Sequence, residues 1–174
     1  MDREFAIECR CSHRAQRFQL AFARQALEFL PRDEATHFEP TGEGLKVLAE
    51  TELALERPIK RLREVYGDDV RIDPPTVRYQ HGRREVQEPH MGLRVRCPPE
   101  CFEALRRDLH LRAAQILDVE VTERFGILRA SAPQSTLVGY PAFVSDVTGG
   151  RGKLVMWLSH YAPVDEPPPG GFAA

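Results

Sequence analysis

The sequence predicts an α+β protein built from two tandem modules, each with the order strand, helix, strand, strand, helix, strand. The first observation is the length of 174 residues, which suits two small modules near the lower size for a self-supporting core. The second is that the same succession of strand-period and helix-period apolar patterns occurs on both sides of a polar stretch at residues 80–85. Each half therefore fits a ferredoxin-like βαββαβ sandwich, in which two helices cover one face of an antiparallel sheet.

The first half supplies all six elements of one such sandwich. Phe5, Ile7 and Cys9 alternate with polar residues, as in a strand with one buried face. Pro31 and Gly67 end two stretches of helical apolar spacing, and Pro58 inside the second stretch predicts a kink or a late helix start. The expected elements are a strand at 4–11, a helix from 12 to 30, a hairpin of strands at 36–39 and 45–49, a helix from 51 to 66 and a strand at 70–79.

The second half repeats this order. The apolar residues between Met91 and Cys97 alternate as a strand, and the following Pro98 and Pro99 open a helix because proline tolerates the first turn. The expected elements are a strand at 91–97, a helix from 99 to about 111, a hairpin of strands at 116–124 and 127–130, a helical region at 133–147 and a strand at 154–158. The predicted boundaries are a first module at 1–80, a linker at 81–87, a second module at 88–165 and a disordered Pro-Gly tail at 166–174.

Charge and composition exclude several classes of function. The formal net charge is −2, so any contact with nucleic acid must use a local basic patch. No apolar run approaches the roughly 20 residues of a membrane helix, and the N-terminus lacks the apolar segment of a signal peptide. We therefore expect a cytoplasmic protein with no membrane partner.

The four cysteines do not have the spacing of a zinc site. They fall as Cys9-x-Cys11 and Cys97-x-x-x-Cys101, and neither pair matches a zinc ribbon. We expect small core residues in a reducing compartment, with Cys101, in the first turn of a helix, the likeliest of the four to be partly exposed. No metal and no other cofactor is predicted.

The glycine-rich loop at residues 148–153 does not predict a nucleotide site. Lys153 is followed by leucine instead of serine or threonine, and the order is helix, loop, strand, the reverse of a phosphate-binding loop. Gly149 or Gly150 is instead placed to cap the preceding helix in a left-handed conformation, while Arg151 can meet a phosphate on a partner.

No catalytic constellation is predicted either. His160 shares the side of its strand with Leu154, Met156 and Leu158, which favours a packed or hydrogen-bonded structural histidine over a general base. The chain contains no asparagine, which excludes acylphosphatase chemistry, and neither half shows the aromatic strand signature of RNA-recognition domains. We expect a protein that is not an enzyme.

The second half resembles the C-terminal domain of elongation factor G, the ribosomal translocase. That domain typically has a Leu-Leu-Glu-Pro-Ile-Met segment, a Phe-Gly-Tyr-Ala-Thr-Asp-Leu-Arg-Ser-Leu-Thr-Gln-Gly-Arg-Gly helix and loop, and a strand ending Ser-His-Tyr-Glu-Pro-Val. The corresponding segments here are EPHM at 88–91, VGYPAFVSDVTGGRG at 138–152 and SHYAPV at 159–164.

The first half resembles the third domain of the same family. Residues 49–56, AETELALE, keep the Glu-Leu-x-Leu-Glu frame of the family's hairpin-to-helix motif but lack its glycines and histidine. The resemblance implies two ferredoxin-like domains without the GTPase, second and fourth domains, and hence no GTPase activity.

The resemblance also implies a partner and the residues that contact it. We expect a ribosome-associated protein that contacts rRNA or ribosomal protein through Arg151, Lys153 and a basic helix segment. The segment comprises Arg106, Arg107, His110 and Arg112, for which a solvated charged helix face is the alternative.

Trp157 stands where the family usually has glutamate. Its apolar sheet face is expected either to pack against the other half or to bind a protein partner or a second copy. The alternative function is accordingly a protein-interaction or dimerisation module that no longer acts on the ribosome. A fragment with no independent activity is a third possibility.

Overall fold

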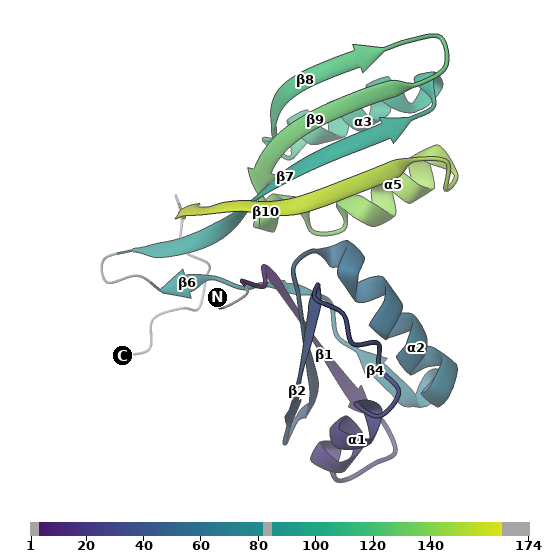
Figure 1. Cartoon of the computed structure of the whole chain (residues 1–174), viewed down its shortest axis with the longest axis vertical. Coiled ribbons are helices and arrows are strands. Elements are labelled where there is room, and N and C mark those ends of the chain that lie inside the picture. The colour runs from purple at the N-terminus through teal and green to yellow at the C-terminus, as the bar shows by residue number, and fades with distance from the viewer. Residues whose placement is uncertain (1–3, 82–84, 165–174) are drawn as a thin grey trace. The chain divides into compact units, whose positions relative to one another are not determined.

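The computed structural model describes residues 4–81 and 85–164 of the chain. The chain forms two compact units, with the boundary between Val77 and Arg78. Each unit carries helices against an antiparallel sheet (Figure 1).

The first unit has the ferredoxin-like strand order. Its sheet runs β2-β3-β1-β4, with every described pair antiparallel and β5 added beside β1. The elements are β1 (Ile7–His13), α1 (Gln19–Ala26), β2 (Thr36–Thr41), β3 (Gly44–Ala49), a 3-10 turn (Glu52–Leu55), α2 (Glu56–Tyr66), a second 3-10 turn (Gly67–Asp69), β4 (Val70–Ile72) and β5 (Thr76–Val77). The late start of α2 that Pro58 predicts is confirmed, because the proline lies in the first turn of that helix.

Helix α1 is shorter than the sequence pattern predicts. It begins at Gln19 and not near Ser12, because Ser12 and His13 belong to β1 and pair with β4. The Gln19 side chain binds the end of β1 and the loop between β1 and α1. Its Oε1 accepts from the backbone N–H of His13 at 2.9 Å, and its Nε2 donates to the carbonyl oxygens of His13 and Gln16 at 2.8 and 2.7 Å. These bonds satisfy one backbone N–H and two carbonyl oxygens at the end of β1 and in the loop between β1 and α1.

The second unit has the same topology with the order β10-β7-β9-β8, all antiparallel. Its elements are β6 (Gln80–His81), β7 (Val86–Cys97), a 3-10 turn (Pro99–Cys101), α3 (Phe102–Leu111), β8 (Gln115–Val121), β9 (Gly126–Pro133), α4 (Gln134–Leu137), α5 (Tyr140–Thr148) and β10 (Lys153–Pro163). Figure 1 shows α3 and α5 behind this sheet. We call the opposite face, turned to the viewer, the outer face.

Strand β7 extends into the segment that the sequence assigned to a linker. It begins at Val86, and β6 pairs with it through Gln80 and His81. The second helical region is divided into α4 and α5 at Gly139, whose φ of 79° is left-handed. The predicted tail at 166–174 lies outside the described residues.

The core of the second unit lies between the sheet and its helices. Met91, Leu93 and Val95 of β7 are fully buried, and they are packed with Leu105 and Leu109 of α3 in this layer. The intervening Arg94 and Arg96 are exposed, because alternate residues of a strand point to opposite faces. The outer face of the sheet is thus polar along β7.

All four cysteines are buried free thiols. Cys101, expected to be partly exposed, is buried, because its Sγ packs against α5 and donates to the carbonyl oxygen of Val147 at 3.4 Å. Burial raises the pKa of Cys97. Within residues 4–81 and 85–164, no cluster of His, Cys, Asp or Glu has the geometry of a metal site.

None of the described helices has both the length and the apolar character needed to cross a membrane.

Candidate functional site

The loop between α5 and β10 begins with a glycine helix cap. Gly149 and Gly150 have φ of 59° and 76°, which are left-handed values. The N–H of Gly149 donates to the carbonyl of Asp146 at 3.2 Å, and the N–H of Gly150 donates to that of Ser145 at 2.8 Å. The predicted capping role of these glycines is confirmed.

Thr148 fixes the rest of this loop from inside the core. Its fully buried Oγ1 donates to the carbonyl oxygen of Val144 at 2.7 Å and accepts from the N–H of Gly152 at 2.8 Å. A Cβ at residue 152 would lie 2.8 Å from that oxygen, so the approach requires glycine. Thr148 therefore fixes the backbone positions from which the side chains of Arg151 and Lys153 project.

Arg151 is held by one carbonyl and one carboxylate. Its Nε donates to the carbonyl oxygen of Thr148 at 3.1 Å, and its Nη1 lies 3.1 Å from Oε1 of Glu100. Both charged side chains of this pair are exposed. The pKa of Glu100 is held below its usual value, first by a hydrogen bond from its own backbone N–H and then by the Arg151 guanidinium.

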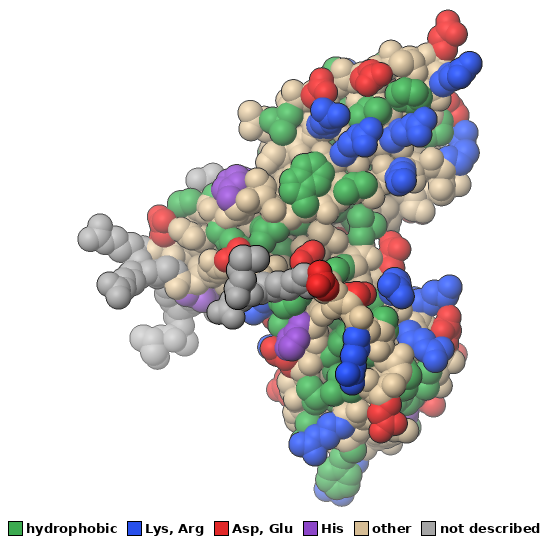
Figure 2. Space-filling model, in the orientation of Figure 1, with side chains coloured by type: hydrophobic (Ala, Val, Ile, Leu, Met, Phe, Trp, Pro, Cys, Tyr) green, Lys and Arg blue, Asp and Glu red, His purple; other side chains and the backbone are tan. Residues whose placement is uncertain are grey.

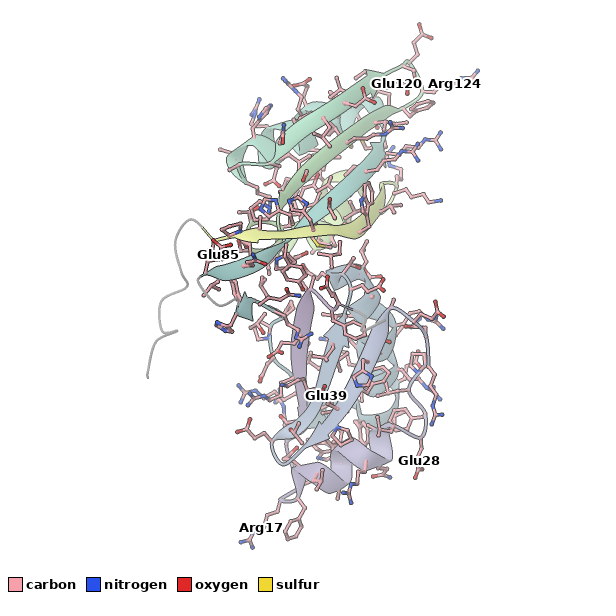
Figure 3. The ribbon with its side chains drawn as sticks, turned by 60° about the vertical axis from the view of Figure 1, so that its left-hand side comes forward. Arg17, Glu28, Glu39, Glu85, Glu120 and Arg124 are labelled. Atoms are coloured by element: carbon pink, nitrogen blue, oxygen red, sulfur yellow. The ribbon has the colours of Figure 1, made fainter. Side chains whose placement is uncertain are left out.

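Arg151 and Lys153 belong to a cavity of about 500 Å³ whose other charged residues come from different elements. We call it the basic cavity; its lining is Arg96, Cys97, Pro98, Pro99, Glu100, Arg124, Phe125, Arg151 and Lys153. Four cationic side chains and one carboxylate give it a positive potential suited to an anion such as phosphate. Figure 3 shows Arg124 beside Glu120 at the tip of the β8–β9 hairpin.

The sequence alone did not identify Arg96 and Arg124 as members of this site. Arg96 lies opposite Lys153 in the β7–β10 register, and its guanidinium lies 4.5 Å from the ring centroid of Phe125. The only signal in the sequence is the alternation at 93–96, which predicts that Arg94 and Arg96 share a strand face. Strand pairing decides that Lys153 joins them.

Trp157 lies on the outer face, on the same side of β10 as Lys153. It pairs with Gly92 of β7, and its side chain remains 47% exposed. The indole lies directly on the Gly92 backbone, because a Cβ at residue 92 would come within 2.6 Å of Cζ2 of the ring. Figure 2 shows Lys and Arg side chains gathered with hydrophobic ones over the strands of this sheet.

The outer cations of the two sheets differ in their pairing. In the first unit, Arg10 pairs with Glu43 at 2.7 Å and Lys46 with Glu8 at 4.0 Å. In the second unit, three outer-face cations have no carboxylate within 4.0 Å among the described residues: Arg94, Arg96 and Lys153. These three remain available to a negatively charged partner.

The basic segment of α3 does not form one surface. Arg106 pairs with Glu103 at 2.8 Å on the helix surface, and Arg107 and His110 are exposed. Arg112 points inward: its Nε lies 2.6 Å from Oδ2 of Asp108, and its Nη1 donates to the carbonyl oxygens of residues 136 and 138. Its bonds stabilise the loop before α5, so we leave Arg112 out of the contact surface.

A bulge changes the position of His160. The β7–β10 register shifts between Leu158 and His160, so His160 pairs with His90 and is exposed. The two rings stack with centroids 5.0 Å apart. The sequence placed His160 with Met156 and Leu158 because alternation cannot reveal an extra residue in one strand.

Comparison with known proteins identifies the second unit. Residues 85–170 match the family model described as elongation factor G C-terminus. Elongation factor G of Mycoplasma pneumoniae is 31% identical over 75 residues, which is 43% of this chain and 11% of that protein. Elongation factor G of Fervidobacterium nodosum is 30% identical over 87 residues, which is 50% of this chain and 13% of that protein.

A solved structure extends the likeness in fold. A crystal structure of a protein from Thermus thermophilus aligns with 95% of this chain and 42% of its own, with a TM-score of 0.64 and 16% sequence identity. At that identity the likeness concerns the fold alone. The family match is independent of it, and residues 85–170 include every residue that lines the basic cavity. Over residues 85–170, just under half of its length, the chain is therefore similar to the C-terminus of elongation factor G.

Proposed function

We propose that this translation-factor-derived protein binds the ribosome through rRNA phosphates and has no GTPase activity. The observation that carries the proposal is the basic cavity, in which Arg96, Arg124, Arg151 and Lys153 surround a single carboxylate. Arginine and lysine bind phosphate through charge-assisted hydrogen bonds, and each neutralised phosphate releases counterions from RNA. A cytoplasmic location follows from this partner.

The family match supports binding and not catalysis. It covers the C-terminus of elongation factor G and does not include the GTPase domain. Both matched relatives are elongation factors, and this chain corresponds to 11% and 13% of their lengths. We therefore propose that this chain provides a surface that binds the ribosome. The nucleotide-driven step belongs to domains that the match does not include.

The exposed residues of α3 are proposed as a second, weaker contact. Arg107 and His110 are exposed at the C-terminal half of the helix, next to Leu111, which is 81% exposed. Arg106 can join them only by leaving Glu103. Because these residues lie on the helix side of the sheet, they contact a different part of a partner from the outer face.

Cosedimentation with ribosomes at about 50 and 200 mM salt tests the proposal. We expect salt-sensitive binding, and we expect the double variant Arg96→Gln/Lys153→Gln to lower the slope of log affinity against log salt by about two units. Arg61→Gln is the matched control, because it removes a cation of the first unit that pairs with Glu64 at 3.1 Å. Arg107→Ala tests the α3 contact separately.

Glu100→Gln is expected to change the affinity for ribosomes in the opposite direction. It removes the one carboxylate that lines the basic cavity among the described residues and frees Arg151, so we expect tighter binding to ribosomes. Absence of cosedimentation at the lower salt concentration would overturn the proposed function. Identical binding by the wild type, Glu100→Gln and the cavity double variant would show that the cavity is not the contact.

A second candidate function is protein interaction or dimerisation. The observation that favours it is the edge strand β8, on which Leu117, Val119 and Val121 are 60%, 50% and 56% exposed. An apolar edge strand offers backbone groups for pairing with another strand. If light scattering detects a dimer that Val119→Lys dissociates, this candidate holds for the second unit.

A further inference from the structure

Trp157 forms a flat aromatic platform on the outer face of the second sheet. Its indole lies against Gly92, because a Cβ there would come within 2.6 Å of three ring atoms, and the side chain is 47% exposed. Gly92 makes this arrangement possible, since any larger residue would push the ring away from the sheet. The ring is thus held against the sheet at Gly92 while about half of the side chain stays accessible to a partner.

Cations and further rings continue the platform along the same two strands. The β7–β10 register places Lys153 opposite Arg96, Val155 opposite Arg94, Trp157 opposite Gly92 and His160 opposite His90. We call the outward side chains of these four pairs the Trp157 strip. Successive rows lie about 7 Å apart along a strand, so the strip is about 20 Å long.

Charge is divided between the two halves of the outer face. The Trp157 strip carries Arg94, Arg96 and Lys153, which have no carboxylate partner among the described residues. The edge strand β8 carries Asp118 and Glu120, and Asp118 lies 3.4 Å from Arg129 of β9. A polyanion on this face is therefore attracted to the β7–β10 half and repelled by the β8 edge.

We propose that the Trp157 strip binds an unpaired segment of RNA, with a base stacked on Trp157 and phosphates bound by Arg94, Arg96 and Lys153. This inference rests on the proposed function for the class of partner. It adds that the RNA is single-stranded and that Trp157 is the residue that contacts a base. An open sheet with an exposed ring suits bases that are free to splay out and stack. A double-stranded helix keeps its bases stacked inside and offers this ring only phosphates and sugars.

The unpaired cations favour RNA over a protein as the occupant. The centre of a protein contact is usually depleted in lysine, and a cation buried there needs a carboxylate partner, although arginine is common beside aromatic residues. Here, Arg94 lies opposite Val155, one row from Trp157, and Arg96 and Lys153 form the next row. A row of cations that continues from an exposed ring along the same strands complements a phosphate backbone with exposed bases.

Trp157 is the only tryptophan of the chain, so its emission reports directly on this site. The experiment titrates the full-length protein with an unstructured single-stranded RNA of about eight nucleotides, and separately with a duplex of the same length. We expect saturable quenching by the single strand and much weaker quenching by the duplex. Equal quenching by the two RNAs would overturn the proposal.

Variants separate stacking from charge, with affinity measured by the anisotropy of a labelled octamer. Trp157→Leu is expected to weaken binding about tenfold without changing the salt slope, since base stacking is lost and every cation stays. Arg94→Gln is expected to lower that slope by about 0.7, the contribution of one phosphate of a single strand. Arg61→Gln is again the matched control. Unchanged affinity in Trp157→Leu would overturn the stacking role.

A further variant guards against a folding defect in Trp157→Leu. Gly92→Ala keeps the tryptophan but displaces its ring, so we expect weaker octamer binding and altered Trp157 emission. Circular dichroism identifies any variant that has lost its fold. If both variants are folded and bind as the wild type does, the proposal fails.

The outcomes distinguish this inference from the proposed function. Octamer binding without ribosome cosedimentation would leave the inference standing and overturn the ribosomal role. Ribosome cosedimentation without quenching by the octamer would overturn the inference alone. If no RNA quenches the emission and Trp157→Leu changes the oligomeric state, the strip is a protein contact and the inference is wrong.

Discussion

Arginine has three different roles within the second unit, although the sequence presents one residue type. Arg96 lines the basic cavity and lies over Phe125, Arg106 pairs with Glu103 at the helix surface, and Arg112 points into the unit. The sequence predicts that charges cluster near the end of a helix. It does not predict which guanidinium is used internally, because that depends on carbonyl groups of a loop far along the chain.

Arg112→Met tests the internal role. Its guanidinium binds Asp108 at 2.6 Å, both side chains are about one-fifth exposed, and it also binds two loop carbonyls. Removing it leaves a partly buried carboxylate and two carbonyls without their donor, so we expect the free energy of unfolding to fall by about 2 kcal/mol. Urea denaturation measures this change.

Arg106→Ala is the matched control for that measurement. It removes an arginine of the same helix whose carboxylate partner is exposed, so we expect a loss below about 0.5 kcal/mol. Equal losses in the two variants would contradict the internal role of Arg112. Ribosome cosedimentation of Arg112→Met should keep the wild-type salt slope, since its guanidinium already has internal partners.

At the scale of elements, the connection from α5 to β10 positions the site. The helix ends in two left-handed glycines, Thr148 binds the N–H of Gly152, and the chain then enters the strand that carries Lys153 and Trp157. The sequence predicted the cap, since only glycine adopts such φ values without strain. The continuation of β7 back to Val86 was not predicted, because Glu88-Pro89-His90 interrupts the apolar alternation while β6 and β10 still supply pairing partners.

Gly149→Ala tests the cap. A Cβ at φ 59° is strained even though no neighbouring atom lies within 4 Å, so we expect a loss of stability of about 1 kcal/mol. Gly42→Ala is the matched control: that glycine also has open space around it but does not have a positive φ. We expect the control to be neutral or slightly stabilising, and thermal unfolding compares the two. Equal shifts would show that the left-handed cap is not what the alanine disturbs.

At the scale of the whole molecule, the chain repeats one topology with different surfaces. Both sheets have the ferredoxin-like order, yet outer cations of the first are paired with carboxylates while three of the second have no such partner among the described residues. Resemblance to elongation factor G implies the shared topology. The unpaired cations and Trp157 are particular to this chain's second unit, where the proposed contacts lie.

A fragment of residues 78–164 tests the independence of that unit. Its core residues, such as Leu93, Leu105 and Leu128, all come from within the unit. We expect the fragment to unfold cooperatively by circular dichroism and to keep the Trp157 emission of the full chain, because a domain of this size can support its own core. A gradual unfolding transition without a folded baseline would contradict this expectation.

The sequence by itself determined the two βαββαβ modules, the glycine cap and the family of the second unit, because apolar period, turn residues and local motifs are properties of neighbouring positions. It also identified Arg151, Lys153 and Trp157 as candidates for contact. Only the tertiary structure decided that Arg96 and Arg124 share a cavity with two of them, that Gly92 supports the Trp157 ring and that Arg112 points inward. The physical reason is that strand register and a bulge bring together residues far apart in the chain, and no local pattern encodes that pairing.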